Sequence, residues 1–183
     1  MATADLERYT SELTEHAKLV LLTLEGDYCA MNEHHLMPQS PPTEAQWAKG
    51  LTSMRQVMLR ATDARIVLGG RTEGYKGVMP GVAEEALLSL QARQPLFLIG
   101  GYGGCARDIA EVLGLILPSA TSRPRWKELD AFDTFKGVDL RNGLTPEENA
   151  TLARTPHIDE AIALILRGLF RLEQEGWFAR TGS

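Results

Sequence analysis

Two apolar runs in this chain each stop at a pair of glycines, and this feature constrains the fold more than any other. The two runs with their glycines are Ala64–Gly70 and Leu96–Gly101. Gly69 and Gly100 are 31 positions apart, which suits a strand, a turn, a helix and a returning parallel strand. The spacing therefore predicts a βαβ unit.

Hydrophobic periodicity around this unit predicts further helices. They cover residues 4–17, 44–60, 82–92, 106–113 and 158–175, and Thr145-Pro146 begins another. Thr43 and Gln46 are predicted to form a capping box at the start of the helix at 44–60. A short buried strand is predicted at 18–24, a further strand or a turn at 115–117, and irregular backbone at 118–143. We therefore expect an α/β fold, a Rossmann-like parallel sheet flanked by helices, in one domain of 183 residues.

A strand that ends in glycines and leads into a helix is a common phosphate-binding arrangement. Glycine lets the backbone approach the anion, and the helix N-terminus supplies free N–H groups and a favourable dipole. The glycines predicted to contact such a ligand are Gly69, Gly70, Gly100, Gly101, Gly103 and Gly104. The alternative is a pair of tight turns without a ligand.

Charged and aromatic residues near these turns extend the predicted site. Residues 55–76 hold five cations against two acids. Arg71 and Lys76 follow the first turn and are the best candidates to neutralise phosphate, and Arg107 follows the second turn. Tyr102 is a candidate to stack on a base, and Asp108 to hydrogen-bond a ribose hydroxyl. The alternatives are solvated cations, a rim tyrosine and an ordinary helix-capping aspartate.

Composition excludes several classes of function. The net charge of −5 argues against a general nucleic-acid binder. No run of about 18 apolar residues is present to span a membrane, and the first residues lack the basic region of a signal peptide. Two cysteines, Cys29 and Cys105, favour a reduced, cytoplasmic setting. The pair His34-His35 has no metal-ligand spacing, so we expect neither a metal nor a cofactor.

Three segments resemble a known superfamily. Met54–Gly70 is similar to the helix and strand that lead into the glycine motif of lonely-guy (LOG) proteins, and Gly81–Glu85 resembles the start of their next helix. Gly101–Ala110 resembles the LOG-like region of TRPM channels and its prokaryotic relatives. The wider group is SLOG (Smf, DprA and LOG). The resemblance covers about residues 50–115 and, more loosely, 142–149.

The resemblance implies a module that senses a nucleotide-derived signal of the ADP-ribose or cyclic ADP-ribose type. Related domains in TRPM channels and in Sir2-linked antiphage effectors recognise ADP-ribose derivatives, which implies a role in signalling or antiviral defence. Such a sensor relays binding to an attached effector or to a homo-oligomer interface.

The resemblance also implies an enzymatic alternative, a LOG-like phosphoribohydrolase that cleaves an N-glycosidic bond. Glu84 or Glu85 would then be the catalytic carboxylate, and Arg55 would bind phosphate. A third alternative is an assembly domain whose helix at 158–175 packs in the core or against a partner.

This chain departs from the family pattern in three places. Arg55 lies about one position from where the catalytic arginine of LOG proteins is expected. The proline that precedes the first glycine pair in LOG proteins is missing at Leu68, and the following loop is longer. No segment before residue 60 resembles the strand–glycine–helix unit that usually comes earlier. We therefore expect this chain to be the second half of a larger domain or protein, with part of the ligand pocket supplied elsewhere.

Overall fold

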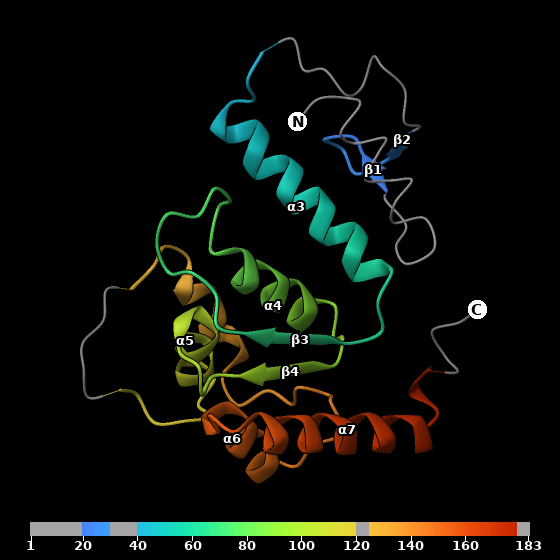
Figure 1. Ribbon diagram of the computed structural model, residues 1–183, viewed down its shortest axis with the longest axis vertical. Helices are drawn as coiled ribbons and strands as arrows, with labels where there is room; N and C mark the ends of the chain where they lie inside the picture. The colour runs from blue at the N-terminus through green and yellow to red at the C-terminus, as the bar shows by residue number, and fades with distance from the viewer. Residues whose placement is uncertain (1–19, 30–39, 120–124, 179–183) are drawn as a thin grey trace. The chain divides into compact units, whose positions relative to one another are not determined.

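The computed structural model describes residues 20–29, 40–119 and 125–178, which form parts of two compact units, Met1–Met54 and Arg55–Ser183. The predicted helix at 4–17 and the pair His34-His35 lie outside the described residues. Figure 1 shows the elements, which in chain order are β1 (Leu21–Leu22), β2 (Tyr28–Cys29), α3 (Glu44–Arg60), β3 (Arg65–Leu68), α4 (Gly81–Gln91), β4 (Leu96–Ile99), α5 (Gly104–Val112), the 3₁₀ helix η1 (Leu129–Phe135), α6 (Pro146–Arg154) and α7 (Ile158–Gln174).

The first unit contains a short hairpin where a buried strand was predicted. β1 pairs antiparallel with β2, with Leu21 opposite Cys29. The prediction of burial is wrong, since Val20 and Leu24 remain 42% and 39% exposed. The strand stops early because Thr23 begins a turn, in which its hydroxyl accepts the N–H of Asp27 at 3.2 Å.

Helix α3 begins and ends where the sequence predicts. The N–H of Gln46 donates to the hydroxyl of Thr43 at 3.2 Å, and the side chain of Gln46 accepts the N–H of Thr43 at 2.9 Å. This reciprocal pair satisfies two N–H groups that a helix start leaves unpaired. The predicted capping box is therefore confirmed.

The second unit is built on the predicted βαβ unit. β3 and β4 are parallel, with Arg65 opposite Leu96 and Leu68 opposite Ile99. Helix α4 connects them and contacts both strands. The α/β fold class with a parallel sheet is thus confirmed, and both glycine turns lie at the carboxyl ends of neighbouring strands.

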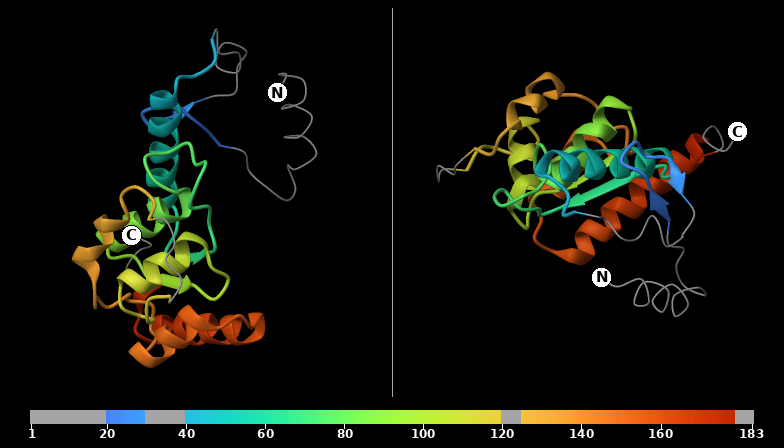
Figure 2. Two further views of the ribbon diagram at one scale, coloured as in Figure 1. Left: turned by 90° about the vertical axis from the view of Figure 1, so that its left-hand side faces the viewer. Right: turned by 90° about the horizontal axis from the view of Figure 1, so that it is seen from above.

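The two faces of β4 pack into separate apolar clusters. Leu96 and Leu98 belong to a cluster with α4, α5 and η1. Phe97 and Ile99 belong to a second cluster with α6 and α7. This alternation is the period-two pattern of a strand that is buried on both faces. Accordingly, α4 and α7 lie on opposite sides of the two strands (Figures 1 and 2).

One local prediction differs from the structure, and of the strand or turn predicted at residues 115–117 the structure favours the turn. Helix α5 begins at Gly104, two residues before the predicted start at residue 106. No strand forms at residues 115–117, where Gly114 at φ +80° ends the helix and the N–H of Leu115 donates to the carbonyl of Ala110 at 3.0 Å. Within the predicted irregular segment, Leu129–Phe135 forms η1.

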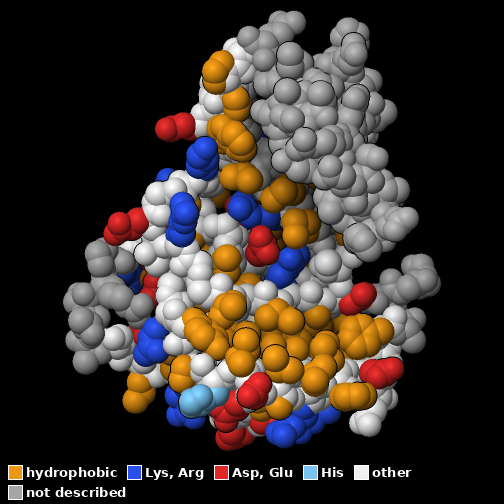
Figure 3. Space-filling model, viewed as in Figure 1, with side chains coloured by type: hydrophobic (Ala, Val, Ile, Leu, Met, Phe, Trp, Pro, Cys, Tyr) orange, Lys and Arg blue, Asp and Glu red, His pale blue; other side chains and the backbone are white. Residues whose placement is uncertain are grey.

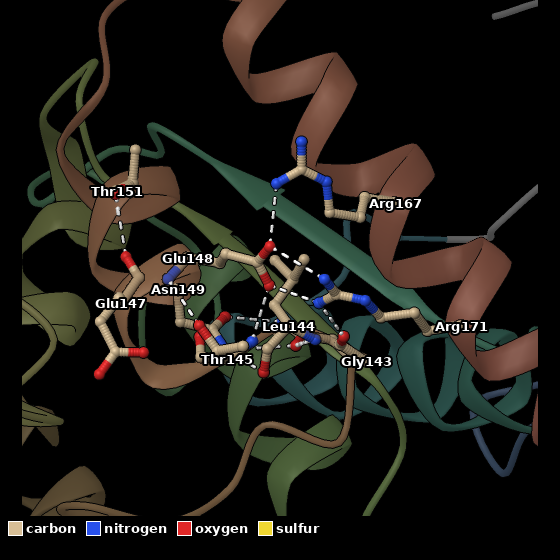
Figure 4. Close-up of polar contacts among 10 residues, drawn as sticks. Gly143, Leu144, Thr145, Glu147, Glu148, Asn149, Thr151, Arg167 and Arg171 are labelled. Carbon is tan, nitrogen blue, oxygen red and sulfur yellow. Dashed lines mark hydrogen bonds and ion pairs between the residues drawn. The ribbon is translucent and has the colours of Figure 1, made fainter.

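A network of polar contacts joins α6 to α7 (Figure 4). Thr145 and Glu148 form a capping box at the start of α6. The carboxylate of Glu148 also accepts hydrogen bonds from Arg171 at 2.5 Å and from Arg167 at 2.9 Å. One carboxylate thus caps a helix and holds the next helix against it.

A pair of buried asparagines connects this corner to the sheet. The side-chain amide of Asn142 donates to the carbonyl of Leu96 at 2.7 Å and to the side chain of Asn149 at 2.8 Å. Asn142 is fully buried and Asn149 is 6% exposed, so loss of either amide leaves buried polar groups without partners. These bonds fix α6 beside β4.

We predict that Glu148 makes stability depend on acid pH. The hydrogen bond from Arg171, the Thr145 N–H and Arg167 lower the pKa of Glu148 from 4.5 to about 2. Because its folded-state pKa is lowered, its contribution is complete above the unfolded pKa and is lost as pH falls from about 4.5 towards 2. Thermal unfolding followed against pH should show a smaller loss over this window for Glu148→Gln than for the wild type.

Glu147→Gln is the matched control, because Glu147 is exposed and makes no ion pair with any described residue. An equal pH profile for wild type and Glu148→Gln would contradict the assignment.

Candidate functional site

The two glycine turns are hydrogen-bonded to each other. The N–H of Ala106 donates to the carbonyl of Gly69 at 2.8 Å, and the N–H of Cys105 donates to the carbonyl of Gly70 at 3.1 Å. The start of α5 therefore holds the first turn through its own unpaired donors. These two N–H groups are occupied by the protein and are not available to a ligand.

Close approach of the two backbones explains two of the glycines. A Cβ on Gly104 would collide with the carbonyl of Gly70, and a Cβ on Gly70 would collide with the Cys105 sulfur. That same Cβ would lie 3.0 Å from Val82 at the start of α4. The first turn therefore lies between the N-termini of α4 and α5, where only glycine fits.

The second turn packs against the end of α6. A Cβ on Gly100 would lie 2.7 Å from the carbonyl of Ala153, and one on Gly101 would collide with the carbonyl of Thr155. Packing thus requires Gly100 and Gly101, as it requires Gly70 and Gly104. The density of glycine in this sequence is therefore not by itself a sign of a ligand.

Gly69 and Gly103 differ, because a Cβ on either would meet open space. Both have positive φ, +61° and +77°. Around them, four backbone N–H groups donate no hydrogen bond to any described residue, those of Gly70, Arg71, Tyr102 and Gly104. The successive N–H groups of Gly70 and Arg71 match a concave anion-binding nest, whereas in the second turn the Gly103 N–H, between Tyr102 and Gly104, donates to the carbonyl of Gly100. This pair of turns is the candidate site.

Some of the side chains predicted to bind a ligand are exposed beside the turns, whereas others are bonded within the protein. Arg71 and Lys76 are exposed in the loop after the first turn, and Tyr102 is 48% exposed beside the second. Arg107 instead forms an ion pair with Glu111 at 3.0 Å. Asp108 accepts the indole N–H of Trp126 at 3.1 Å, which ties the turn to the segment before η1.

The three residues of the enzymatic alternative do come together. Arg55 Nη1 lies 2.5 Å from Glu84 Oε2, and Arg55 Nε lies 3.8 Å from Glu85 Oε1. Arg55 and Glu84 are only 8% and 5% exposed. Glu84 lies in the first turn of α4 and Glu85 directly follows it, so Glu84 offsets both the buried guanidinium and the helix dipole.

The loop before α4 is shaped around this guanidinium. A Cβ on Gly81 would lie 2.5 Å from Arg55 Nη2, and one on Gly77 would lie 3.6 Å from Arg55 Nη1. Glycine at residue 81 therefore lets the backbone pass over the charged group, whereas 3.6 Å at Gly77 is an ordinary van der Waals distance. Arg55 therefore fastens the loop and the start of α4, and its predicted contact with phosphate stays a prediction.

Sequence reasoning missed Arg65 as a member of this cluster. Arg65 is 9% exposed, and its Nη1 lies 3.2 Å from Glu85 Oε2. Its sequence position, at the start of a strand, did not indicate that its side chain is buried, because this burial depends on the packing of α4 against β3. The Nε atoms of Arg55 and Arg65 are buried without a hydrogen-bond partner in the described part of the chain.

Cys105 is fully buried. Burial raises the pKa of its thiol from 9.0 to about 11, so the thiol stays protonated at neutral pH and is no nucleophile. In the described ranges no group of three His, Cys, Asp or Glu residues is placed to hold a metal ion. No helix among the described residues is long and apolar enough to cross a membrane.

Comparison with known protein families identifies one match. The family model SLOG cluster2 matches residues 1–152, most of the 183-residue chain. No curated protein and no solved structure matches. The resemblance to the SLOG superfamily is confirmed, while the closer likeness to the prokaryotic relatives of TRPM channels stays a prediction.

We predict that Arg55 and Glu84 are strongly coupled in stability. Removing one partner leaves a buried charge without its counter-ion, which costs roughly 3 kcal/mol or more. Arg55→Met and Glu84→Leu should each lower the free energy of unfolding by this amount. The double variant should lose much less than the sum of both, as measured by urea unfolding.

The exposed pair Arg125–Asp130 has the same 2.5 Å separation and serves as the control. Its removal through Asp130→Ala should cost under about 1 kcal/mol. Additive losses for Arg55→Met and Glu84→Leu would show that the buried pair is not coupled.

Proposed function

The chain belongs to the SLOG cluster2 family, and we propose that it is a sensor of a nucleotide-derived ligand. The ligand carries phosphate and ribose and is of the ADP-ribose or cyclic ADP-ribose type. The observation that carries this proposal is the pair of joined glycine turns at the carboxyl ends of β3 and β4. In open α/β sheets, ligands bind at that end of the strands.

The geometry of the turns favours a diphosphate. The N–H groups of Gly70 and Arg71 belong to the first turn, and those of Tyr102 and Gly104 belong to the second. Because the cross-turn hydrogen bonds hold the two turns together, the remaining N–H groups of each turn can bind one of two linked phosphates. A preformed site of this kind avoids most of the ordering cost of binding.

Side chains around the two glycine turns supply charge and an aromatic surface. Arg71 is exposed next to Gly70 and makes no contact with a described residue that would occupy its guanidinium. It therefore is the first candidate to neutralise phosphate, with Lys76 in the same loop. Tyr102, exposed beside the second turn, offers a ring for the base or ribose. Arg107 is the weakest candidate, since Glu111 already pairs with it.

The runner-up is a LOG-like hydrolase that cleaves an N-glycosidic bond. The observation in its favour is that Arg55, Glu84 and Glu85 meet at the start of α4. In this role one carboxylate stabilises the positive charge that develops on the ribose. However, Glu84 is 5% exposed and paired with Arg55, so it must be released before it can reach a substrate. For this reason we favour the sensor.

We propose that a second copy of this chain receives the binding signal. Large apolar side chains of β3 and α7 remain exposed on the face seen in Figure 3. Those exposed by 49% or more are Ile66, Leu68, Ile158, Ile162, Leu166 and Phe170; they are called the apolar face below. Apolar patches of this kind usually mark an interaction site.

The dipole of α7 supports a second copy as the occupant. Asp159 and Glu160 lie in its first turn, and both Arg167 and Arg171 near its other end pair with Glu148. Two α7 helices packed antiparallel about a two-fold axis would bring opposite helix dipoles together and cover the exposed apolar side chains of both copies.

The ligand proposal predicts a thermal shift. At about 100 times its dissociation constant, a ligand adds roughly 2.7 kcal/mol and should raise the unfolding midpoint by several degrees. We expect ADP-ribose or cyclic ADP-ribose to do so more than NAD or AMP, and to be recovered intact by chromatography. Recovery of a free base would favour the hydrolase instead.

Gly69 allows a matched pair of variants to locate this binding. Asn and Asp both tolerate positive φ, and a Cβ there meets open space. Gly69→Asp places a carboxylate where phosphate is proposed and should weaken binding by roughly tenfold or more relative to Gly69→Asn. Equal affinity of the two variants would contradict a phosphate site at this turn.

The assembly proposal predicts that the chain forms dimers in solution. Light scattering after size exclusion should give the mass of two chains, and Leu166→Glu should give the mass of one. Leu117→Glu is the control, because Leu117 is 86% exposed and lies outside the apolar face. A wild-type chain that is monomeric with and without ligand would contradict the proposal.

A further inference from the structure

A second groove lies at the opposite end of the strands from the glycine turns. Its volume is about 600 Å³, within the size range of small-molecule sites. Its walls come from the end of α3, from the residues that follow α4, and from Arg141 and Trp177. The groove therefore lies before the start of β3 and β4, where open α/β sheets do not ordinarily bind ligands.

Three arginines line this groove, namely Arg60, Arg93 and Arg141, against one acidic residue, Asp63. All three are exposed, and none forms an ion pair with a residue in the described ranges. The other arginines close to this region differ, since Arg65 pairs with Glu85 and Arg171 with Glu148. Among the described residues the groove thus carries more positive than negative charge.

Two of these arginines occupy backbone conformations that favour glycine. Arg93 has φ +56° and Arg141 has φ +55°. Arg93 follows the end of α4, where its N–H donates to the carbonyl of Leu90 at 3.1 Å; glycine is the usual residue at such a helix end. Glycine would adopt this backbone conformation at a lower conformational energy than arginine. An arginine at such a position therefore suggests a function for its side chain.

Hydrogen bonds and a cation–π contact hold the walls of the groove in place. The side-chain amide of Gln94 donates to the carbonyl of Leu59 at 3.2 Å and also to the carbonyl of Thr62, which joins the end of α3 to the residues after α4. The guanidinium of Arg141 lies 5.3 Å from the ring centre of Trp177, a cation–π contact that orients it. The arginines are therefore presented by a preformed surface.

We propose that this groove binds an anion with two or more phosphoryl groups. Three guanidinium groups in one groove match the charge and the oxygen-rich surface of a diphosphate, which arginine recognises through paired N–H donors. Because the groove and the glycine turns lie at opposite ends of β3 and β4, this site is separate from the proposed sensor site. It does not depend on the function proposed above.

Titration calorimetry with inorganic pyrophosphate tests the proposal on the full chain. We expect Arg93→Gly and Arg141→Gly each to raise the dissociation constant at least tenfold. Both should keep the wild-type unfolding midpoint or raise it, because glycine relieves the backbone strain. Arg154→Gln, which removes an exposed arginine at the end of α6, should change neither quantity.

Arg60→Gln provides a variant without a change in backbone conformation and should also weaken binding. Gly69→Asp should leave pyrophosphate binding in this groove unchanged, which separates it from the glycine turns. A comparison of ADP with pyrophosphate distinguishes a nucleotide, which would bind more tightly, from recognition of the diphosphate alone.

Three results would overturn the proposal. The first is no pyrophosphate binding by the wild type. The second is binding that Gly69→Asp removes while Arg93→Gly and Arg141→Gly leave it intact. The third is a lowered unfolding midpoint in both glycine variants, since the arginines would then be needed for the fold.

Discussion

The contact between the two glycine turns is the constraint on which the rest of the second unit depends. The first N–H groups of α5 donate to the carbonyls of Gly69 and Gly70, so the helix that follows one strand is fixed to the end of its neighbour. This contact requires glycine at residues 70 and 104, where any side chain would collide with the opposite turn. It also closes the βαβ unit at its carboxyl edge, since Val82 at the start of α4 lies against Gly70.

The same contact determines what the edge can bind. It occupies the donors of Cys105 and Ala106 and leaves the N–H groups of Gly70, Arg71, Tyr102 and Gly104 without a partner among the described residues. The acidic start of α4 is in turn neutralised by Arg55 and Arg65, and Arg55 also lies against the end of the preceding loop at Gly81. The resulting site consists mainly of backbone N–H groups with Arg71 exposed beside them, which suits phosphate recognition.

Local signals made much of this fold predictable from the sequence. The spacing of Gly69 and Gly100 gave the βαβ unit, and Thr43 with Gln46 gave the start of α3. Features that depend on distant residues could not be predicted. The period of α7 predicted its apolar residues on one side of the helix. Ile165 and Leu172 are buried whereas Ile162 and Leu166 are exposed, because the described cluster with β4 and α6 covers part of that side. Likewise the glycine-rich second turn indicated a ligand, but Gly100 and Gly101 are explained by the end of α6. The expectation that this chain is half of a larger domain stays a prediction.

Backbone amide NMR during titration with ADP-ribose tests the central claim most directly. If the joined turns form the anion site, the largest amide shift changes should occur at Gly70, Arg71, Tyr102 and Gly104. The amides of Cys105 and Ala106, which already donate across the turns, should keep their protection from hydrogen exchange. Saturable binding whose shift changes leave both turns unaffected, or no binding at all, would contradict the account.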